Sequence, residues 1–255
     1  MLAWQPQVQL PQRRIDGVEA LVRWRQPGGV VVLPEEFIPV AEEIGLVLEI
    51  DEWVLREACH QNCRWQKHWQ QHGLPPLPVS VNVSLARFDA GRLLANVGAV
   101  LRDTGLEPRW LEIEFKGAQL FAQGARGQAL VAALKALGVR VAADDFGSGP
   151  ASLGALAQFA FDTLKIDRRF VQTIVQEAPS RAVTAAVLGI GQAMGYRVIA
   201  KGVETDAQYD ALLQLGCSGM QGTMFGEAAS AEHFARLVAQ GVVEPGRAGR
   251  EAVSG

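Results

Sequence analysis

The feature that most constrains this chain is a regular alternation of strand-like and helix-like segments along almost its whole length. Short apolar runs bounded by Gly, Pro or charged residues alternate with longer segments in which apolar residues recur every three to four positions. Strands are expected at Ala3–Leu10, Ile15–Trp24, Leu77–Val83, Trp110–Phe115, Val139–Ala143, Phe161–Ile166, Arg197–Ala200 and Gly219–Gln221. Helices are expected at Pro34–Glu43, Leu48–Gln71, Gly91–Thr104, Gly127–Leu137, Arg181–Met194, Asp206–Leu215 and Ala231–Ala239. About eight strands with intervening helices predict an α/β barrel of the TIM type.

A doubly wound open sheet is the alternative, but no glycine-rich phosphate loop follows the first strand. No linker divides the pattern, so residues 1–242 are expected to form one barrel domain. Residues 243–255, with their Gly, Arg, Ala and Ser, are expected to form a frayed tail. The chain begins directly in the first expected strand, which indicates a fragment of a longer protein with flanking signalling domains.

Charge and cysteine content exclude several classes of protein. The chain has 24 basic and 27 acidic residues and a net charge of -3, so it has no basic excess for DNA binding. Three cysteines without a framework spacing indicate a reducing compartment. We find no signal peptide and no apolar run long enough to cross a bilayer. A cytoplasmic domain is expected, either free or as the cytoplasmic part of a membrane-anchored protein.

Polar side chains stand at or near the ends of the expected strands, which converge on one mouth in a barrel. They are Glu19, Asn82, Glu114, Asp144, Asp145, Lys165, Asp167, Lys201, Glu204 and Gln221. Carboxylate and amide oxygens suit Mg²⁺ or Mn²⁺, and two such ions about 3.5–4 Å apart favour attack on a phosphodiester. One such acid alone would be interpreted as a solvated charge at a strand end. Polar groups at seven strand ends together favour a shared site.

The motifs that carry these residues resemble those of the EAL domain family. They are Trp4-Gln5-Pro6, Glu-x-Leu-x-Arg-Trp from Glu19, Ser80-Val81-Asn82-Val83-Ser84, Asp144-Asp145-Phe146-Gly147-Ser148-Gly149, Leu164-Lys165-Ile166-Asp167 and Gln221-Gly222. The resemblance covers about residues 3 to 240 in the family's order and spacing. It implies a modified TIM barrel in which one strand runs antiparallel to the rest.

Active members of that family use Mg²⁺ or Mn²⁺ to hydrolyse cyclic di-GMP to pGpG. Carried across by position, the resemblance implies metal ligands at Glu19, Asn82, Glu114, Asp144 and Asp145. It places Lys165 near the attacked phosphate and its water. It also implies dinucleotide contacts at Gln5, Leu21, Arg23, Glu204 and Gln221. A homodimer formed through the helical face beside the loop after the fifth strand is a further expectation from the family.

Two departures from the family pattern affect the expected chemistry. Active members read Ala-Glu-Gly-Val-Glu where this chain has Ala200-Lys201-Gly202, and that first Glu is metal-associated and the proposed general base. They read Glu-Ile-Thr-Glu where this chain ends in Lys116-Gly117, and that second Glu braces the loop carrying the paired aspartates. Milder departures are Pro150-Ala151 and the missing proline after Phe225-Gly226.

A protonated lysine neither binds a cation nor accepts a proton, so Lys201 is expected to replace a lost metal as an internal counter-ion among Glu114, Asp144 and neighbouring acids. There are two alternatives. Lys201 acts as a neutral base, or its side chain points to solvent. Clustered carboxylates oppose the first of these because they raise a lysine's pKa.

Three functions therefore compete. The leading hypothesis is a degenerate EAL domain that binds cyclic di-GMP or transmits a signal without efficient hydrolysis and with little or no metal. The second is an active metal-dependent phosphodiesterase that produces pGpG. The third is a protein-interaction module that no longer binds nucleotide.

Overall fold

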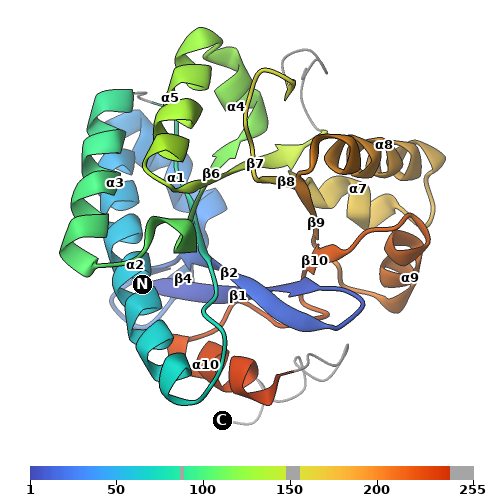
Figure 1. The fold of residues 1–255 in the computed structure, drawn as a ribbon, viewed down its shortest axis with the longest axis horizontal. Coiled ribbons are helices and arrows are strands. Elements are labelled where there is room, and N and C mark those ends of the chain that lie inside the picture. The colour runs from blue at the N-terminus through green and yellow to red at the C-terminus, as the bar shows by residue number, and fades with distance from the viewer. Residues whose placement is uncertain (87–88, 148–155, 242–255) are drawn as a thin grey trace.

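Eight strands close into a barrel, and helices lie around its outside (Figure 1). The computed structural model describes residues 1–86, 89–147 and 156–241. Around the barrel the order is β1 (Leu2–Gln9), β10 (Gly219–Gln221), β9 (Arg197–Lys201), β8 (Thr163–Ile166), β7 (Arg140–Phe146), β6 (Leu111–Lys116), β5 (Val79–Asn82) and β2 (Arg14–Val22). Only β1 runs antiparallel to its neighbours; the other described strand pairs of the barrel are parallel. The predicted modified TIM barrel with one antiparallel strand is confirmed.

Helices lie at all seven predicted places, to within three residues at each end, and two further short helices, at Gly117–Ala122 and Arg168–Thr173, were not predicted. The helices are α1 (Pro34–Ile44), α2 (Val47–Gln71), α3 (Ala90–Thr104), α4 (Gly117–Ala122), α5 (Ala125–Ala136), α7 (Arg168–Thr173), α8 (Ala178–Met194), α9 (Asp206–Gln214) and α10 (Ala231–Gln240). Among the helices in the described part of the chain, none combines the length and the apolar character that crossing a membrane requires. The predicted tail at 243–255 and the departure at Pro150 and Ala151 lie outside the described residues.

The parallel strands carry apolar residues toward the helices and polar residues toward the barrel interior. In β6, for example, Leu111, Ile113 and Phe115 are buried members of the apolar core. The residues between them, Glu112 and Glu114, are also buried, and they contact side chains of other strands inside the barrel. Successive side chains of a strand point to opposite faces. This two-residue period therefore separates the apolar layer between strands and helices from the charged interior of the barrel.

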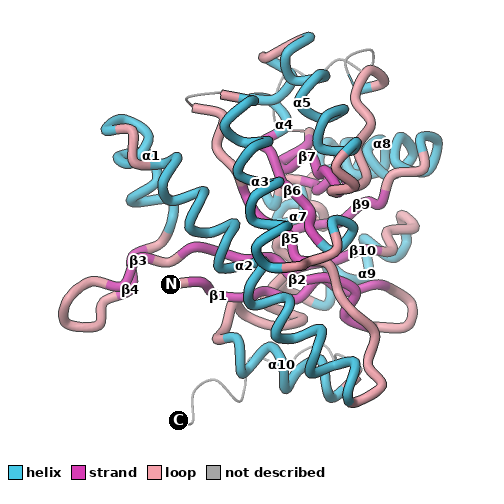
Figure 2. The backbone as a smooth tube through the Cα atoms, turned by 60° about the vertical axis from the view of Figure 1, so that its left-hand side comes forward, coloured by secondary structure: helices cyan, strands magenta, loops and turns pink. Residues whose placement is uncertain are grey.

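One predicted strand is interrupted. Ile15–Trp24 was expected to be continuous, but β2 ends at Val22, and Trp24 begins a separate hairpin of β3 (Trp24–Arg25) and β4 (Val31–Val32). The break lies at Arg23, whose backbone exchanges hydrogen bonds with Met1 and so marks the edge of the barrel. Figure 2 shows the hairpin and α1 extending away from the barrel on the side where the N-terminus lies.

Candidate functional site

Glu19 is the centre of a buried network at the mouth of the barrel. Asn82 Nδ2 donates to Glu19 Oε1 at 2.8 Å, while Lys165 Nζ and Gln221 Nε2 donate to Oε2 at 2.9 and 2.8 Å. Burial acts to raise its pKa, but the ammonium groups of Lys165 and Lys201 outweigh it and hold the pKa of Glu19 at about 2. Glu19 is therefore a carboxylate whose oxygens are already satisfied.

Lys165 joins two acids across the barrel. Its side chain is fully buried and forms ion pairs with Glu19 and Glu114. Burial would lower the pKa of Lys165, but Glu114 and Glu19 raise it above its ordinary value. Glu114 is the less satisfied acid, since its Oε1 contacts Lys165 but its Oε2 accepts no hydrogen bond from the described residues. Burial, followed by the negative charge of Glu19, raises the pKa of Glu114 to about 8.

Lys201 holds the paired aspartates. Its Nζ donates to Asp144 Oδ1 and Oδ2 at 2.6 and 2.7 Å, and to Asp145 Oδ1 at 3.1 Å. Burial would lower the pKa of Lys201, but Asp144, Glu19 and Asp145 raise it, so the group is an ammonium. The expected counter-ion contact with Asp144 is present. Of the acids among which Lys201 was expected to lie, Glu114 pairs with Lys165, while Asp144 and Asp145 pair with Lys201.

A bulge in β7 explains how adjacent aspartates reach one lysine. Neighbouring residues of a regular strand point to opposite faces. Between Ala143 and Phe146, however, the pairing with β8 shifts, and Asp145 has a φ of 51°. An extra residue at a bulge turns a side chain that would otherwise point away. Both carboxylates therefore face the Lys201 ammonium.

Gly117 lies directly beside this bulge. It is the first residue of α4, and a Cβ built on it would lie 3.4 Å from the backbone oxygen of Asp144. Its φ is outside the left-handed region, so a larger side chain is sterically admissible there. A side chain at this position would pack against the bulge, and glycine has no side chain to provide that support.

The predicted dinucleotide contacts divide into two groups. Gln5 and Gln221 belong to the network, because Gln221 Nε2 donates to Gln5 Oε1 at 3.0 Å as well as to Glu19. Leu21 and Arg23 are half-buried near the end of β2, where Arg23 Nη1 donates to the Val22 carbonyl at 2.9 Å. Glu204 is exposed in the turn after β9. Leu21, Arg23 and Glu204 thus lie at the rim, where a ligand could contact them, and their side chains make no hydrogen bond to the described residues of the network around Glu19.

A second polar layer lies deeper in the barrel, and sequence reasoning missed it. Glu112 accepts hydrogen bonds from Ser80 Oγ at 2.9 Å and from Thr163 Oγ1 at 2.7 Å. Each of these residues stands two positions before a member of the upper network, Glu114, Asn82 or Lys165. The repeated polar residue at the same two-residue spacing was the signal that could have revealed the layer.

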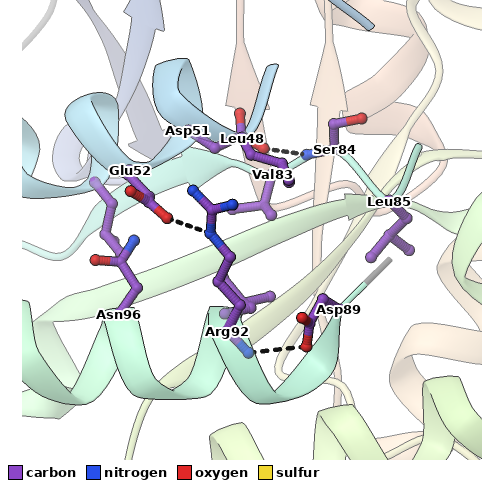
Figure 3. A pocket seen from close by; sticks show the side chains of 11 residues that line it. Leu48, Asp51, Glu52, Val83, Ser84, Leu85, Asp89, Arg92 and Asn96 are labelled. Atoms are coloured by element: carbon purple, nitrogen blue, oxygen red, sulfur yellow. Dashed lines mark hydrogen bonds and ion pairs between the residues drawn. The ribbon is translucent and has the colours of Figure 1, made fainter. Parts of the chain in front are cut away.

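The turn after β5 is fixed by two acids from outside the barrel. Ser84 N donates to Asp51 Oδ2 at 2.9 Å, and Ser84 Oγ donates to Glu42 Oε1 at 2.6 Å. A cavity of about 40 Å³ lies beside this turn, between α2 and α3 (Figure 3). It has room for a few water molecules but not for a nucleotide, and it lies beside the charged network without being part of it.

The implied metal ligands do not fit a pair of divalent ions in this arrangement. Both oxygens of Asp144 are held by Lys201, and both oxygens of Glu19 accept hydrogen bonds from protein groups. Two divalent ions among these acids would have to share the space with two charged ammonium groups. Their mutual repulsion opposes that arrangement as long as Lys201 keeps its proton.

The barrel topology has known counterparts. The family model described as the EAL domain matches residues 1–228. The chain belongs to the EAL domain family. A signalling protein of uncharacterised function from Caulobacter vibrioides is 40% identical over 226 residues, which are 89% of this EAL chain and 27% of that protein. MucR of Pseudomonas aeruginosa, a bifunctional diguanylate cyclase and cyclic di-GMP phosphodiesterase, is 34% identical over 94% of this chain and 34% of its own length.

Solved EAL structures agree with the fold. The MucR phosphodiesterase in complex with cyclic di-GMP is 34% identical, with a TM-score of 0.86 over 92% of this chain and 93% of that one. The EAL domain of Mycobacterium smegmatis DcpA is 26% identical, with a TM-score of 0.79 over 95% and 99% of the two chains. This EAL domain thus belongs to a family with members in cyclic di-GMP signalling, and it spans about a third of the length of the curated relatives named above.

Proposed function

We propose that this EAL domain binds cyclic di-GMP and transmits its presence without efficient hydrolysis. The observation that carries the proposal is the ammonium of Lys201 on both oxygens of Asp144. It puts a fixed positive charge where the active members of the family have a metal-associated carboxylate. A group that is already protonated cannot accept the proton of an attacking water.

The retained groups support binding. Gln5 and Gln221 line the network, and Arg23 stands half-buried at the rim with further guanidinium donors to offer a phosphate. Lys165 and Lys201 offset part of the negative charge of the surrounding acids without a bound ion, so less repulsion opposes a phosphate. The likeness to MucR, which forms a complex with cyclic di-GMP, favours the same ligand here. Binding on this basis is independent of divalent metal.

The domain would act as one part of a larger signalling protein, because the matched relatives are about three times as long as this chain. In that setting the domain would report the concentration of the dinucleotide to neighbouring domains. Without a catalytic turnover step, occupancy follows the ligand concentration directly.

A metal-dependent phosphodiesterase is the second candidate. It is favoured by the convergence of Glu19, Asn82, Glu114 and Lys165 at one mouth. Under this candidate a divalent ion would have to displace Lys201 from Asp144.

Calorimetric titration with cyclic di-GMP separates the candidates when it is run once with Mg²⁺ and once with EDTA, beside a chromatographic assay for pGpG. The proposal expects equal affinity in both buffers and no more than traces of pGpG. Binding that EDTA abolishes, with pGpG release that is lost in Glu19→Ala, would establish the phosphodiesterase. If cyclic di-GMP binds in neither buffer, the remaining hypothesis is a protein-interaction module that no longer binds nucleotide.

A further inference from the structure

An unpartnered apolar face lies on α1 and the β3–β4 hairpin. Phe37, Val40 and Ile44 lie three and four residues apart in α1, so these side chains lie on one side of the helix, and Leu33 immediately precedes it. Val40 is 54% exposed and Ile44 is 64% exposed. Only Ala41 among the helix residues is fully buried. Short helices gain most of their stability from packing such a face, and here most of the face is left open.

The hairpin extends this face. Trp24 of β3 contacts Phe37 edge-on, with ring centroids 6.0 Å apart, and is itself 50% exposed. Val31 on β4 is also exposed. Large exposed hydrophobic side chains occur elsewhere on the described residues, but Leu137 and Leu213, for example, are distant from each other in sequence and stand at different elements. A contiguous exposed apolar patch marks an interaction surface. We call this surface, formed by Trp24, Val31, Leu33, Phe37, Val40 and Ile44, the α1 face.

Charge around the α1 face selects its partner. The segment from Trp24 to Leu55, which includes the whole hairpin and α1, contains one basic residue, Arg25, and seven acidic residues, Glu35, Glu36, Glu42, Glu43, Glu49, Asp51 and Glu52. Glu35, Glu36, Glu43 and Glu49 are exposed. A second copy of this chain would bring the same acids against them, and an anionic membrane would be repelled. Complementarity therefore favours a partner that is both apolar and basic.

We propose that the α1 face docks a basic amphipathic helix of a partner protein. Its apolar stripe would cover Val40, Ile44 and Trp24, and its Lys and Arg residues would face the acids of α1. Binding of an amphipathic helix along an apolar surface is a recurring mode of protein recognition. The basic flanks would set orientation and association rate, while the apolar contact would supply most of the affinity.

The test uses the whole chain and a synthetic probe. The probe is an 18-residue helical peptide with Leu and Trp on one face and Lys on the other, labelled for fluorescence anisotropy; a matched peptide carries Glu in place of Lys. We expect the Lys peptide to bind and the Glu peptide to bind at least tenfold more weakly. Val40→Ser with Ile44→Ser should weaken binding of the Lys peptide at least tenfold, and Leu213→Ser on α9 should leave it unchanged.

Three results would overturn the proposal. The first is equal binding of the Lys peptide by the double variant, or an equal loss in Leu213→Ser. The second is co-sedimentation of the chain with phosphatidylglycerol vesicles that the double variant loses, which would assign the face to a membrane. The third is a concentration-dependent dimer in sedimentation velocity that the same variant abolishes, which would assign it to a second copy. Because all the substitutions are on exposed side chains, an unchanged thermal melt verifies that each variant is folded.

Discussion

The Nζ of Lys201 lies within hydrogen-bonding distance of both carboxylate oxygens of Asp144, so one residue occupies both acceptors of another. The side chains are 19% and 6% exposed, which makes this a largely buried ion pair. Removing one partner of such a pair leaves the other as an uncompensated buried charge. Three testable predictions concern this pair, the glycine beside its bulge and an arginine at the rim, and a fourth concerns Asp51 on α2.

Lys201→Met is expected to destabilise the protein by about 3 kcal/mol, because Asp144 and Asp145 lose their ammonium. The measurement is the free energy of unfolding in urea at pH 7. Arg64→Met is the control, since the Arg64–Glu57 pair is exposed on α2 and should cost less than about 1 kcal/mol. Equal costs for the two variants would contradict a structural role for the Lys201 pair.

Lys201→Glu together with Gly117→Glu is expected to restore metal dependence. The first change returns a carboxylate to the site, and the second places a side chain beside the Asp144 backbone, where its Cβ would make ordinary van der Waals contacts. Groups that act as a unit are not additive, so pGpG release by the double variant should exceed the sum of the two single variants.

Stability provides a second readout for the same variants. Lys201→Glu adds a negative charge to a pocket of acids, so its melting temperature without metal should fall below that of the starting protein and rise when Mg²⁺ is added. The starting protein should show no comparable rise. A double variant that neither gains stability with Mg²⁺ nor releases pGpG would show that the pocket has diverged at further positions.

Arg23→Ala is expected to weaken cyclic di-GMP binding by roughly 1.5–3 kcal/mol, about 10- to 150-fold, if the guanidinium pairs with a phosphate. Arg25→Ala is the matched control, because Arg25 is exposed on the hairpin. Calorimetry in EDTA gives both affinities. If the affinity does not change in Arg23→Ala, or falls equally in Arg25→Ala, Arg23 is not a ligand contact.

Asp51→Asn is expected to change how stability depends on pH. Burial raises the pKa of Asp51 from 3.8 to about 7, although the Ser84 backbone N–H acts in the opposite direction. The folded state therefore holds a proton that the unfolded state releases, so this contribution is fully present below pH 3.8. It is lost as the pH rises through about 7, and it amounts to at most about 4 kcal/mol.

The Asp51→Asn curve should accordingly fall less steeply than the wild-type curve between pH 4 and 7. The amide keeps an acceptor for Ser84 N, so the comparison isolates the titration. Glu49→Gln, an exposed acid in the same helix, is the control and should follow the wild type. Parallel wild-type and Asp51→Asn curves would show that Asp51 is ionised throughout.

Much of the barrel could be predicted from the sequence because the longer strands and helices each have a recognisable local pattern of apolar residues. The apolar periodicity of segments such as Leu111–Lys116 is a property of a few neighbouring residues, and the structure places a strand there. Short elements carry too little pattern to detect. The two-residue strands of the hairpin and the six-residue helices α4 and α7 were missed for this reason.

The candidate site was predictable in its members but not in its pairings. Lys201, Asp144 and Glu19 were all identified, yet which lysine contacts Glu114 depends on where β8 and β9 stand across the barrel. The bulge that turns Asp145 toward Lys201 is a matter of strand register, and one residue of shift reverses the direction of every side chain. Such relationships are set by the whole sheet.

Closure of the barrel by β1 has a consequence for how the protein is made. Gln5 and Gln221 are 216 residues apart in sequence, and β1 finds its second neighbour, β10, only there. During synthesis one edge of β1 therefore stays unpaired until β10 has emerged from the ribosome. The carboxylate of Glu19 waits as well, since Gln221 completes its set of donors. The pocket is thus finished only after β10 has been made, and a chain cut short before β10 would have neither a closed barrel nor a complete site.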